Sequence, residues 1–441
     1  MGTIVAKFGG TSLAAPEQFR KIKDIIVQNP NRRILVASAP GKRYPDDVKV
    51  TDLLLAACEL AKEGQDFEDV LLKIRERYNA IISALEVNLA LDEEIGKIRS
   101  HLQGEVSEEY IASRGEYLNA RILAAYLGFT FVDPEWCVCF HENGSLDLMM
   151  TQRAMKAALL PLSKAVIAGF YGADMKGVIH TFSRGGSDVT GSLAAAAVHA
   201  DLYENWTDVS GLLAADPRII DKPHTVKYIS FRELRTLSYM GASVLHTDAV
   251  LPVSDLGIPI NIRNTFQPQN PGTMIVRKLP KGEKKDPIVA VAGRTGMSVL
   301  QIEKVMVSDE SGFTAIILDI LKNRQLPFEQ CLTGIDTVTL VIRSDLLNPC
   351  KEDLCAEIRQ MLNPDYLGLK ENLSMIAIIG EQGTEASDAN VRVLYALIRS
   401  DIQISTINQG AGKLNLLIGV PEEKYQDAIR VIYETIKDCA D

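Results

Sequence analysis

The sequence predicts an α/β fold in which helices cover both faces of a mostly parallel sheet, followed by two smaller α+β repeats. In the first half, continuous apolar runs such as Ile34–Ala37 and Val166–Phe170 alternate with helical patterns, which is typical of parallel strands buried on both faces. Residues 267–286 are rich in Pro, Gly and Lys and predict a linker with one short strand inside it. The last third carries the order β-α-β-β-α twice, which indicates an internal repeat.

The composition is that of an ordinary folded protein. The chain has 441 residues, of which 46% are hydrophobic and 24% charged, so wholesale disorder is excluded and about three domains are expected. The formal net charge is −10, which makes nucleic acid and anionic membranes poor partners. No apolar run reaches the ~18–20 residues of a membrane span, and the first residues lack the pattern of a signal peptide.

The cysteines indicate a reducing compartment. Seven cysteines are too few for a disulfide scaffold in a chain of this length, and their number is odd. Cys137 and Cys139 have no second Cys/His pair near them in the sequence, so free thiols on alternate residues of a buried strand are favoured over a zinc site. We therefore expect a cytoplasmic protein.

The first half opens with a strand over Thr3–Phe8 that two glycines, Gly9 and Gly10, bring to an end. Ligands of parallel sheets bind at the carboxyl ends of the strands, so the functional site is expected where these strands end. The helices share apolar residues at three- and four-residue spacing and are expected at Asp52–Lys62, twice within Phe67–Gln103, at Ala112–Tyr126 and at Thr190–Ala200.

The last third is predicted to contain two similar α+β units. In each unit the first helix starts 14 residues before the next strand, at 312 and 326 and at 388 and 402. The pattern favours a pair of two-layer, ferredoxin-like domains over two generic segments that coincide. An extra strand is expected at Ile288–Gly293. The other strands are expected at 298–303, 326–332, 337–342, 374–379, 402–408 and 414–420, and the helices at 312–323, 351–362, 388–400 and 422–437.

The first strand ends in the motif KFGGTS, which starts at Lys7. Glycines let the backbone approach anionic oxygens, and the N–H groups that follow can form a nest for phosphate. A lysine beside such a nest supplies a point charge for a phosphoryl group. The spacing fits neither a P-loop nor a dinucleotide fingerprint. The alternative interpretation is a glycine turn with a solvated lysine.

Two further motifs suit an amino acid. In SRGGSD, Arg184 and Asp188 flank a glycine turn before the Ala-rich helix. A guanidinium suits a carboxylate and a carboxylate suits an ammonium, so the pair can hold both ends of a zwitterion, although a helix cap explains the motif as well. In SRGE, Glu116 can bind an amino group or simply favour a helix start. Thr207 and Asp208 in WTDV are nucleotide contacts or turn formers.

Taken together, KFGGTS, SRGE, SRGGSD and WTDVSGLLAADPR resemble the aspartate kinases of the amino acid kinase family, and the C-terminal repeat resembles their paired ACT domains. The resemblance implies ATP- and Mg²⁺-dependent phosphorylation of the β-carboxylate of L-aspartate to 4-phospho-L-aspartate, the first step toward lysine, threonine and methionine. It also implies a kinase domain over 1–284 and a regulatory region over 285–441. The ACT units would cover about 297–365 and, interleaved with it, 285–296 plus 370–441.

The resemblance also assigns roles to residues. Lys7, Arg184 and Asp188 would act in catalysis. The aspartate site would comprise Ser38, Thr51, Glu116, Arg184 and Asp188, and the ATP site Lys7, Gly9, Gly10, Thr207, Asp208, Leu213 and Arg218. A carboxylate that attacks a triphosphate is already ionised at pH 7, so charge neutralisation and positioning are needed rather than a general base.

One position departs from the family pattern. The family commonly has GAKVLHP, with a lysine on the ATP phosphates, whereas this chain has Ser243 and Thr247 in GASVLHT. Lys222 or Lys227 are candidates for the missing charge. Two alternatives follow: another kinase of the same family acting on a different acid, or an amino acid sensor with little catalytic activity.

The resemblance extends to feedback control. Ser308, Asp309, Phe328, Glu329 and Asp336 match the effector pocket of lysine-sensitive relatives. Lysine carries two ammonium groups and one carboxylate, so an acidic lining favours it over threonine. The alternative is that these acids are solvated loop residues. Because ACT repeats usually pair across chains, a homodimer or a dimer of dimers is expected.

Overall fold

The computed structural model describes residues 2–104, 106–183, 185–241, 245, 247–283, 286–305, 312–380, 384–409 and 415–440. The chain divides into two compact units. The first comprises residues 1–212, 225–238 and 243–284, and the second comprises 213–224, 239–242 and 285–441.

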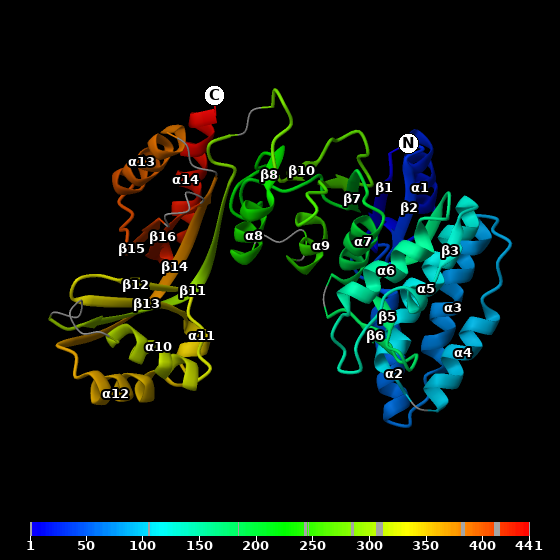
Figure 1. The fold of residues 1–441 in the computed structure, drawn as a ribbon, viewed down its shortest axis with the longest axis horizontal. Helices are drawn as coiled ribbons and strands as arrows, with labels where there is room; N and C mark the ends of the chain where they lie inside the picture. The colour runs from blue at the N-terminus through cyan, green and yellow to red at the C-terminus, as the bar shows by residue number, and fades with distance from the viewer. Residues whose placement is uncertain are drawn as a thin grey trace. The chain divides into compact units, whose positions relative to one another are not determined.

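An eight-stranded sheet forms the centre of the first unit, in the order β3-β4-β2-β1-β7-β9-β10-β8 (Figure 1). Every pair of neighbours is parallel except β9 and β10. The predicted mostly parallel sheet is thus confirmed. Its strands are β1 (Ile4–Phe8), β2 (Arg32–Ala37), β3 (Thr130–Val132), β4 (Ala165–Ala168), β7 (Leu202–Thr207), β8 (Tyr228–Ser230), β9 (Ile260–Asn264) and β10 (Thr273–Val276).

Helices cover this sheet, and each expected helix is present with shifted ends. A two-stranded hairpin of β5 (Tyr171–Ala173) and β6 (Ile179–Thr181) lies beside them. The α-helices of this part are α1 (Pro16–Gln28), α2 (Val50–Lys62), α3 (Glu68–Ala84), α4 (Asp92–Gln103), α5 (Glu108–Leu127), α6 (Leu148–Leu159), α7 (Gly186–Ala197), α8 (Phe231–Tyr239) and α9 (Leu251–Ser254). Short 3-10 turns lie at η1 (Thr11–Leu13), η2 (Pro134–Trp136) and η3 (Thr247–Ala249).

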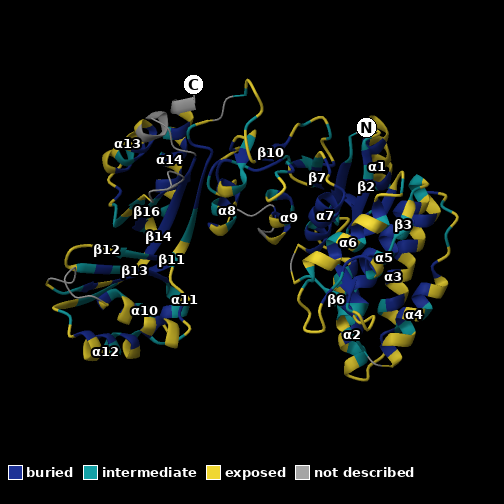
Figure 2. Cartoon of the chain, viewed as in Figure 1, coloured by how far each residue is buried: buried dark blue, intermediate teal, exposed yellow. Residues whose placement is uncertain are grey.

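Helix α7 is the most deeply buried of these elements (Figure 2). Its alanines and glycines have little side-chain volume, so the helix backbone can pack closely on the sheet. It begins at Gly186, four residues before the predicted start at Thr190, because Gly185 adopts a left-handed conformation with φ of 58° and turns the chain into the helix. Asp188 consequently lies in the first helical turn rather than before it.

The second unit contains a six-stranded antiparallel sheet in the order β12-β13-β11-β14-β16-β15. In Figure 1, α10 and α12 lie beside β12 and β13, and α13 and α14 lie beside β15 and β16. The elements are β11 (Ala290–Glu303), α10 (Phe313–Asn323), β12 (Gln330–Thr333), β13 (Thr337–Arg343), α11 (Ser344–Leu347), α12 (Lys351–Leu362), β14 (Tyr366–Ile379), α13 (Thr384–Arg399), β15 (Thr406–Gln409), β16 (Asn415–Pro421), η4 (Glu422–Lys424) and α14 (Tyr425–Ala440).

Some local expectations differ from the structure. The extra strand and the first strand of the repeat are one continuous strand, β11. The predicted linker 267–286 contributes its short strand, β10, to the first sheet. Cys137 and Cys139 lie outside the named strands, and only Cys139 forms a single β-bridge, to Ala173.

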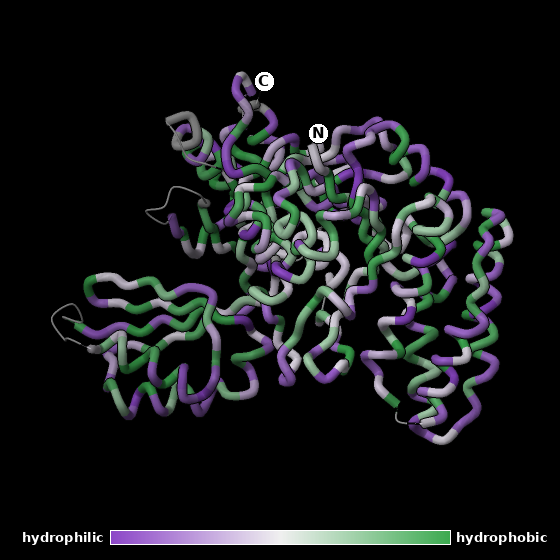
Figure 3. The backbone as a smooth tube through the Cα atoms, turned by 45° about the vertical axis from the view of Figure 1, so that its right-hand side comes forward, coloured by the Kyte–Doolittle hydropathy of each residue, from purple (hydrophilic) through white to green (hydrophobic). Residues whose placement is uncertain are grey.

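Hydrophobic and hydrophilic stretches alternate along many of the helices (Figure 3), as expected for helices with one face against a core. Within the described residues, no helix is long and apolar enough to cross a membrane.

Candidate active site

The first unit gathers most of the predicted residues at one edge of its sheet. Strands β1, β2, β4, β7 and β9 are parallel to one another, so their carboxyl ends lie at the same edge. Gly9 and Gly10 follow β1, Ser38 follows β2, and Asp208 follows β7. This is the edge at which α/β sheets bind ligands.

Lys7 is a buried cation on the penultimate residue of β1. Its Nζ lies 2.5 Å from Oδ1 of Asp188, in the first turn of α7. A Cβ atom at Gly9 would lie 3.5 Å from the same Nζ, so glycine leaves the space next to the ammonium open. The lysine predicted to stabilise a phosphoryl group is therefore held by an acidic partner at the strand end.

The backbone of the first glycine loop crosses a second loop that follows β2. The N–H of Gly41 donates to the carbonyl of Gly10 over 2.8 Å. A Cβ at Gly41 would lie only 2.6 Å from the carbonyl carbon of Gly10, so only glycine fits at this crossing. No role was expected for Gly41, although SAPGK after a buried strand is a signal of a tight turn.

A buried ionic cluster fixes this second loop. Arg77 on α3 donates to the carbonyls of Gly41 and Val48, and its guanidinium lies 3.3 Å from Asp47. Burial lowers the pKa of Arg77. Hydrogen bonds from Arg43 are the main reason that the pKa of Asp47 lies well below its usual range. A loop held by carbonyl contacts to a buried arginine has little freedom to move.

Glu116 is a buried carboxyl group on α5. Burial raises its pKa from 4.5 to about 8, although the backbone N–H of Ala39 and the charge of Lys7 act in the opposite direction. Its Oε2 has no hydrogen-bond partner among the described residues. A buried acceptor without a donor is costly, which makes this oxygen a candidate ligand for an ammonium group.

The residues predicted to accompany Glu116 lie close to it. The neighbouring Gly115 is so tightly packed that a Cβ there would lie 2.9 Å from the Cβ of Ala39 and 3.7 Å from Oγ1 of Thr51. The structure thus brings Ser38, Thr51 and Glu116 to one corner of the site.

Asn119 is a member of this corner that the sequence analysis missed. One helical turn after Glu116, its Nδ2 donates to the carbonyl of Ser38 over 2.6 Å. The N–H of Ala39, in the same peptide unit, lowers the pKa of Glu116, so both side chains of α5 interact with this peptide unit. The loop that carries Ser38 is thereby fixed on α5.

The turn before α7 packs against the end of β4. A Cβ at Gly169 would lie 2.5 Å from Oγ of Ser187, and one at Gly186 would lie 2.6 Å from Cδ2 of Phe170. These close approaches place the start of α7, and with it Asp188, at the sheet edge. Arg184, the predicted carboxylate ligand, lies outside the described residues.

The predicted nucleotide contacts Thr207 and Asp208 lie at the end of β7. Oγ1 of Thr207 donates to the Asp208 carboxylate over 3.2 Å. Asn264, at the end of β9, donates to the backbone carbonyl of Asp208 over 3.1 Å. Oγ of Ser12 and Oγ1 of Thr265 lie 2.8 Å apart, which joins the KFGGTS loop to the end of β9. Sequence reasoning did not predict these polar links.

Leu213 and Arg218 belong to the second unit. The N–H of Val291 on β11 donates to the carbonyl of Ala214, so this segment is attached to the second sheet. Arg218 pairs with Asp216 through contacts of 3.0 and 2.7 Å and is largely exposed. Ser243 lies outside the described residues.

The described effector candidates lie on both sides of β12: Phe328 and Glu329 precede it, and Asp336 follows it. Glu329 accepts a hydrogen bond from the hydroxyl of Tyr239 and lies 3.9 Å from Arg294. Asp336 is exposed and lies between β12 and β13. Phe328 is also exposed. Ser308 and Asp309 lie outside the described residues.

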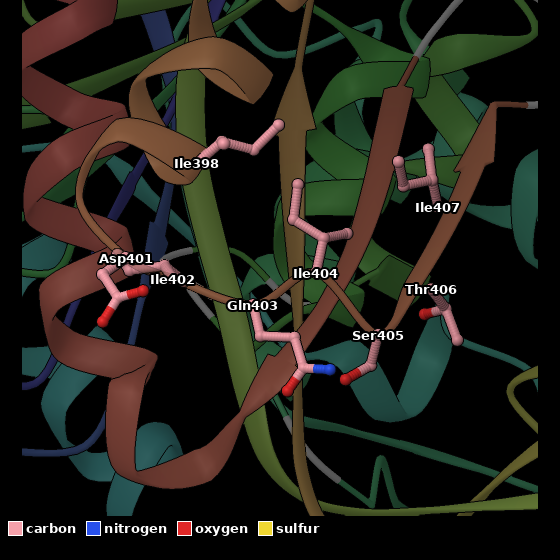
Figure 4. Close-up of a pocket in the computed structure, with 8 residues that line it drawn as sticks. All are labelled: Ile398, Asp401, Ile402, Gln403, Ile404, Ser405, Thr406 and Ile407. Atoms are coloured by element: carbon pink, nitrogen blue, oxygen red, sulfur yellow. The ribbon is translucent and has the colours of Figure 1, made fainter.

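A separate pocket of about 650 Å³ lies in the second unit, where α13 leads into β15. Figure 4 shows Ile398 of α13 and Ile404 and Ile407 beside polar side chains of the connecting segment. In the other half of this unit, Phe328 and Glu329 precede β12 in the same way that this segment precedes β15. The pocket therefore lies at the position in the second repeat that corresponds to the predicted effector position in the first.

A family model and near-full-length relatives agree with this geometry. The amino acid kinase family model matches residues 2–264, and an ACT domain model matches 376–436. Aspartokinase 3 of Bacillus subtilis is 32% identical over 98% of this chain and 98% of its own. The crystal structure of the Clostridium acetobutylicum aspartate kinase covers 99% of this chain and 100% of that chain, with 40% identity and a TM-score of 0.87.

A crystal structure of Escherichia coli aspartokinase III in complex with aspartate and ADP covers 98% of this chain and 99% of that chain, with 25% identity and a TM-score of 0.73. The buried lysine, the glycine crossing and the carboxyl group on α5 all lie in the part of the chain that the kinase model matches. The chain therefore belongs to the amino acid kinase family and, within it, to the aspartokinases.

Proposed function

We propose that this aspartate kinase transfers the γ-phosphoryl group of ATP to the β-carboxylate of L-aspartate and forms 4-phospho-L-aspartate. The observation that carries the proposal is the joint presence, at one sheet edge, of the Lys7–Asp188 pair and the unpartnered oxygen of Glu116. The first suits a phosphoryl group and the second an ammonium group. The E. coli relative crystallised with aspartate and ADP supports the same pair of ligands.

The proposed roles follow from charge. Glu116 receives the substrate ammonium, and Arg184 receives its α-carboxylate, with Ser38 and Thr51 beside them. A β-carboxylate oxygen attacks the γ-phosphorus, and the bond to the oxygen between the β- and γ-phosphorus breaks, releasing ADP. Lys7 neutralises the charge on the phosphoryl oxygens during transfer. On the nucleotide side, Gly9, Gly10, Thr207, Asp208, Leu213 and Arg218 remain proposed contacts.

Mg²⁺ is proposed as the companion of ATP. The described residues contain no group of three or more His, Cys, Asp or Glu side chains that could form a metal cage. This fits an ion that takes most of its oxygen ligands from the triphosphate and water. When bound, Mg²⁺ would neutralise phosphate charge, and Asp208 at the end of β7 is the proposed protein ligand.

The reaction is tested by trapping. Purified protein with ATP, Mg²⁺, L-aspartate and hydroxylamine should form aspartyl hydroxamate, and coupled ADP release should require aspartate. Lys7→Ala should lower kcat by at least about 100-fold while the protein stays folded, because its charge acts mainly in the transition state. ADP release with another acid but not with aspartate would identify a different kinase of the family, and absence of all turnover would favour an amino acid sensor.

We also propose that lysine is the feedback effector. Glu329 is held by the Tyr239 hydroxyl and approached by Arg294, so an ammonium group of lysine can compete for a carboxylate that already attracts donors. With this effector we also propose that the reaction is the first step toward lysine, threonine and methionine. Lysine and threonine should be titrated at sub-saturating aspartate against wild type and Glu329→Gln. Inhibition by threonine alone, or lysine inhibition that the substitution leaves unchanged, would contradict this assignment.

The domain limits remain a proposal: a kinase domain over 1–284 and ACT units over 297–365 and over 285–296 plus 370–441. Support comes from β11, whose first part pairs with the end of β14 (Ala290 with Ile379) and whose second part pairs with β13 (Leu300 with Leu340). One long strand thus serves both halves of the regulatory sheet. We further propose a homodimer or dimer of dimers through these repeats, which light scattering of the full chain measures.

A further inference from the structure

Asn205 is a buried polar residue at the centre of the sheet to which sequence analysis gave no role. It lies on β7, and the strand register pairs it with Lys7 on β1. Side chains at paired positions of neighbouring strands point to the same face of a sheet. That face carries α7, which packs against both strands. Asn205 and Lys7 therefore approach the first turn of α7 together.

Both side chains meet the same atom. Nδ2 of Asn205 donates to Oδ1 of Asp188 over 2.8 Å, and Nζ of Lys7 lies 2.5 Å from that oxygen. The hydroxyl of Tyr203, two residues earlier on β7, donates to the backbone carbonyl of Asp188 over 3.1 Å. Strand β7 thus holds Asp188 by its main chain and by its carboxylate.

A buried amide is a costly choice for packing alone, because an apolar side chain fills the same space without needing a partner. A neutral donor on an ion-paired carboxylate has a specific effect. It fixes the carboxylate rotamer without adding charge, and it shares the oxygen that attracts the lysine. The ammonium is then attracted less strongly to Asp188 than it would be in an isolated ion pair.

We propose that Asn205 is a positioning residue for phosphoryl transfer, which it influences through Asp188 and Lys7. Its amide keeps the Asp188 carboxylate in one orientation, so that the ammonium of Lys7 is presented at the sheet edge and can pass to the phosphoryl oxygens. Without the amide, Asp188 rotates or closes fully on Lys7, and the charge is misplaced when it is needed. This inference rests on the proposed kinase reaction.

The test uses the full chain and two substitutions. Asn205→Ala removes the donor, and Asn205→Asp keeps the shape but replaces the amide with a carboxyl group. Both should lower kcat by about 10- to 100-fold while KM for aspartate and for ATP stays within about threefold, because the lost interaction acts on the transferred group. In Asn205→Asp, kcat relative to wild type should recover as pH falls, because a protonated carboxyl group donates to Asp188 as the amide does.

Asn261 on β9 supplies the matched control. It is a buried asparagine of the same sheet that donates to the carbonyls of Pro271 and Thr273 over 3.0 and 3.1 Å, away from Asp188. Asn261→Ala should lower Tm and leave kcat within about twofold. The proposal is overturned if both Asn205 variants keep the wild-type kcat. It is also overturned if their loss of kcat is no larger than that of Asn261→Ala at a similar loss of Tm and the kcat of Asn205→Asp does not recover at low pH. A wild-type enzyme that forms no hydroxamate would instead refute the proposed function.

Discussion

Aspartate binding should release a proton from Glu116. Burial raises the pKa of this carboxyl group to about 8, so at pH 7 it is protonated about ten times more often than it is ionised. Ionising it to receive the substrate ammonium therefore costs about 1.4 kcal/mol at pH 7. The apparent affinity for aspartate is reduced by the fraction of protein that is competent to bind, which is about one in eleven at pH 7 and about one in two at pH 8.

A rise in pH strengthens aspartate binding but weakens the contribution of Glu116 to the stability of the fold. KM for aspartate should fall about fivefold from pH 7 to pH 8 and change little above pH 9. The folded pKa lies above the unfolded value of 4.5, so the native state binds more protons between about pH 4.5 and 8. The contribution of Glu116 to the free energy of unfolding therefore decreases as pH rises through this window.

Calorimetric titration of aspartate at pH 7, in phosphate and in Tris, measures the protons released. We expect about 0.9 proton per site for wild type and none for Glu116→Gln. Glu94→Gln is the matched control: Glu94 is a buried glutamate of α4 paired with Arg121, and its variant should release the same number of protons as wild type. If wild type released no proton and KM for aspartate were constant from pH 6 to 8, Glu116 would not be the protonated ammonium ligand.

Two further perturbations test the loop crossing and the effector site. Gly41→Ala places a Cβ 2.6 Å from the Gly10 backbone and should lower Tm and lower kcat/KM at least tenfold. The control is Gly96→Ala in mid-helix, where a Cβ meets nothing within 4 Å, and it should raise the free energy of unfolding by about 0.5–1 kcal/mol in urea denaturation. Equal behaviour of the two variants would show that the crossing is not tight. Tyr239→Phe removes the hydroxyl that Glu329 accepts from and should lower the lysine concentration for half-maximal inhibition, so an unchanged concentration would mean that Glu329 does not bind the effector.

Local patterns were sufficient for most of the elements. The apolar run that ends at Gly9 is a strand, and the helix expected at 351–362 has those bounds in the structure. Such elements are determined by the spacing of their own apolar residues, which the sequence displays directly. The alternation of strands and helices along the sequence favours a parallel sheet, which is why this prediction was confirmed.

Strand continuity was harder to predict than strand position. The residues between the two expected strands at 288–293 and 298–303 include Arg294 and Gly296, which interrupt the apolar pattern. The structure passes through them as one strand, with a register shift between Arg294 and Met297 against β14. A bulge absorbs the interruption without ending the strand, and a pattern in one segment does not reveal the partner that makes this possible.

The partners of the site residues were not predictable for a related reason. Asn119 meets the carbonyl of Ser38 across 81 residues, and Arg77 meets that of Gly41 across 36. Each of these contacts forms only because the fold places two distant segments side by side. A sequence motif does not show which distant segment will lie beside it. Motifs therefore identified the residues expected to touch ligands, whereas the residues that hold them in place came from the structure.

The charges of the candidate site are balanced within the protein. Lys7 is paired with Asp188, and the pKa of about 8 keeps Glu116 mostly neutral at pH 7. In the proposed reaction, each substrate group would exchange one internal partner for an external one: the ammonium would replace the proton on Glu116, and the phosphoryl oxygens would draw Lys7 from Asp188. Because the charge of Lys7 also lowers the pKa of Glu116, moving that charge toward ATP makes Glu116 harder to ionise unless the ammonium is present. In the proposed reaction the two substrates are thus coupled through Lys7, whose movement toward ATP would raise the pKa of Glu116.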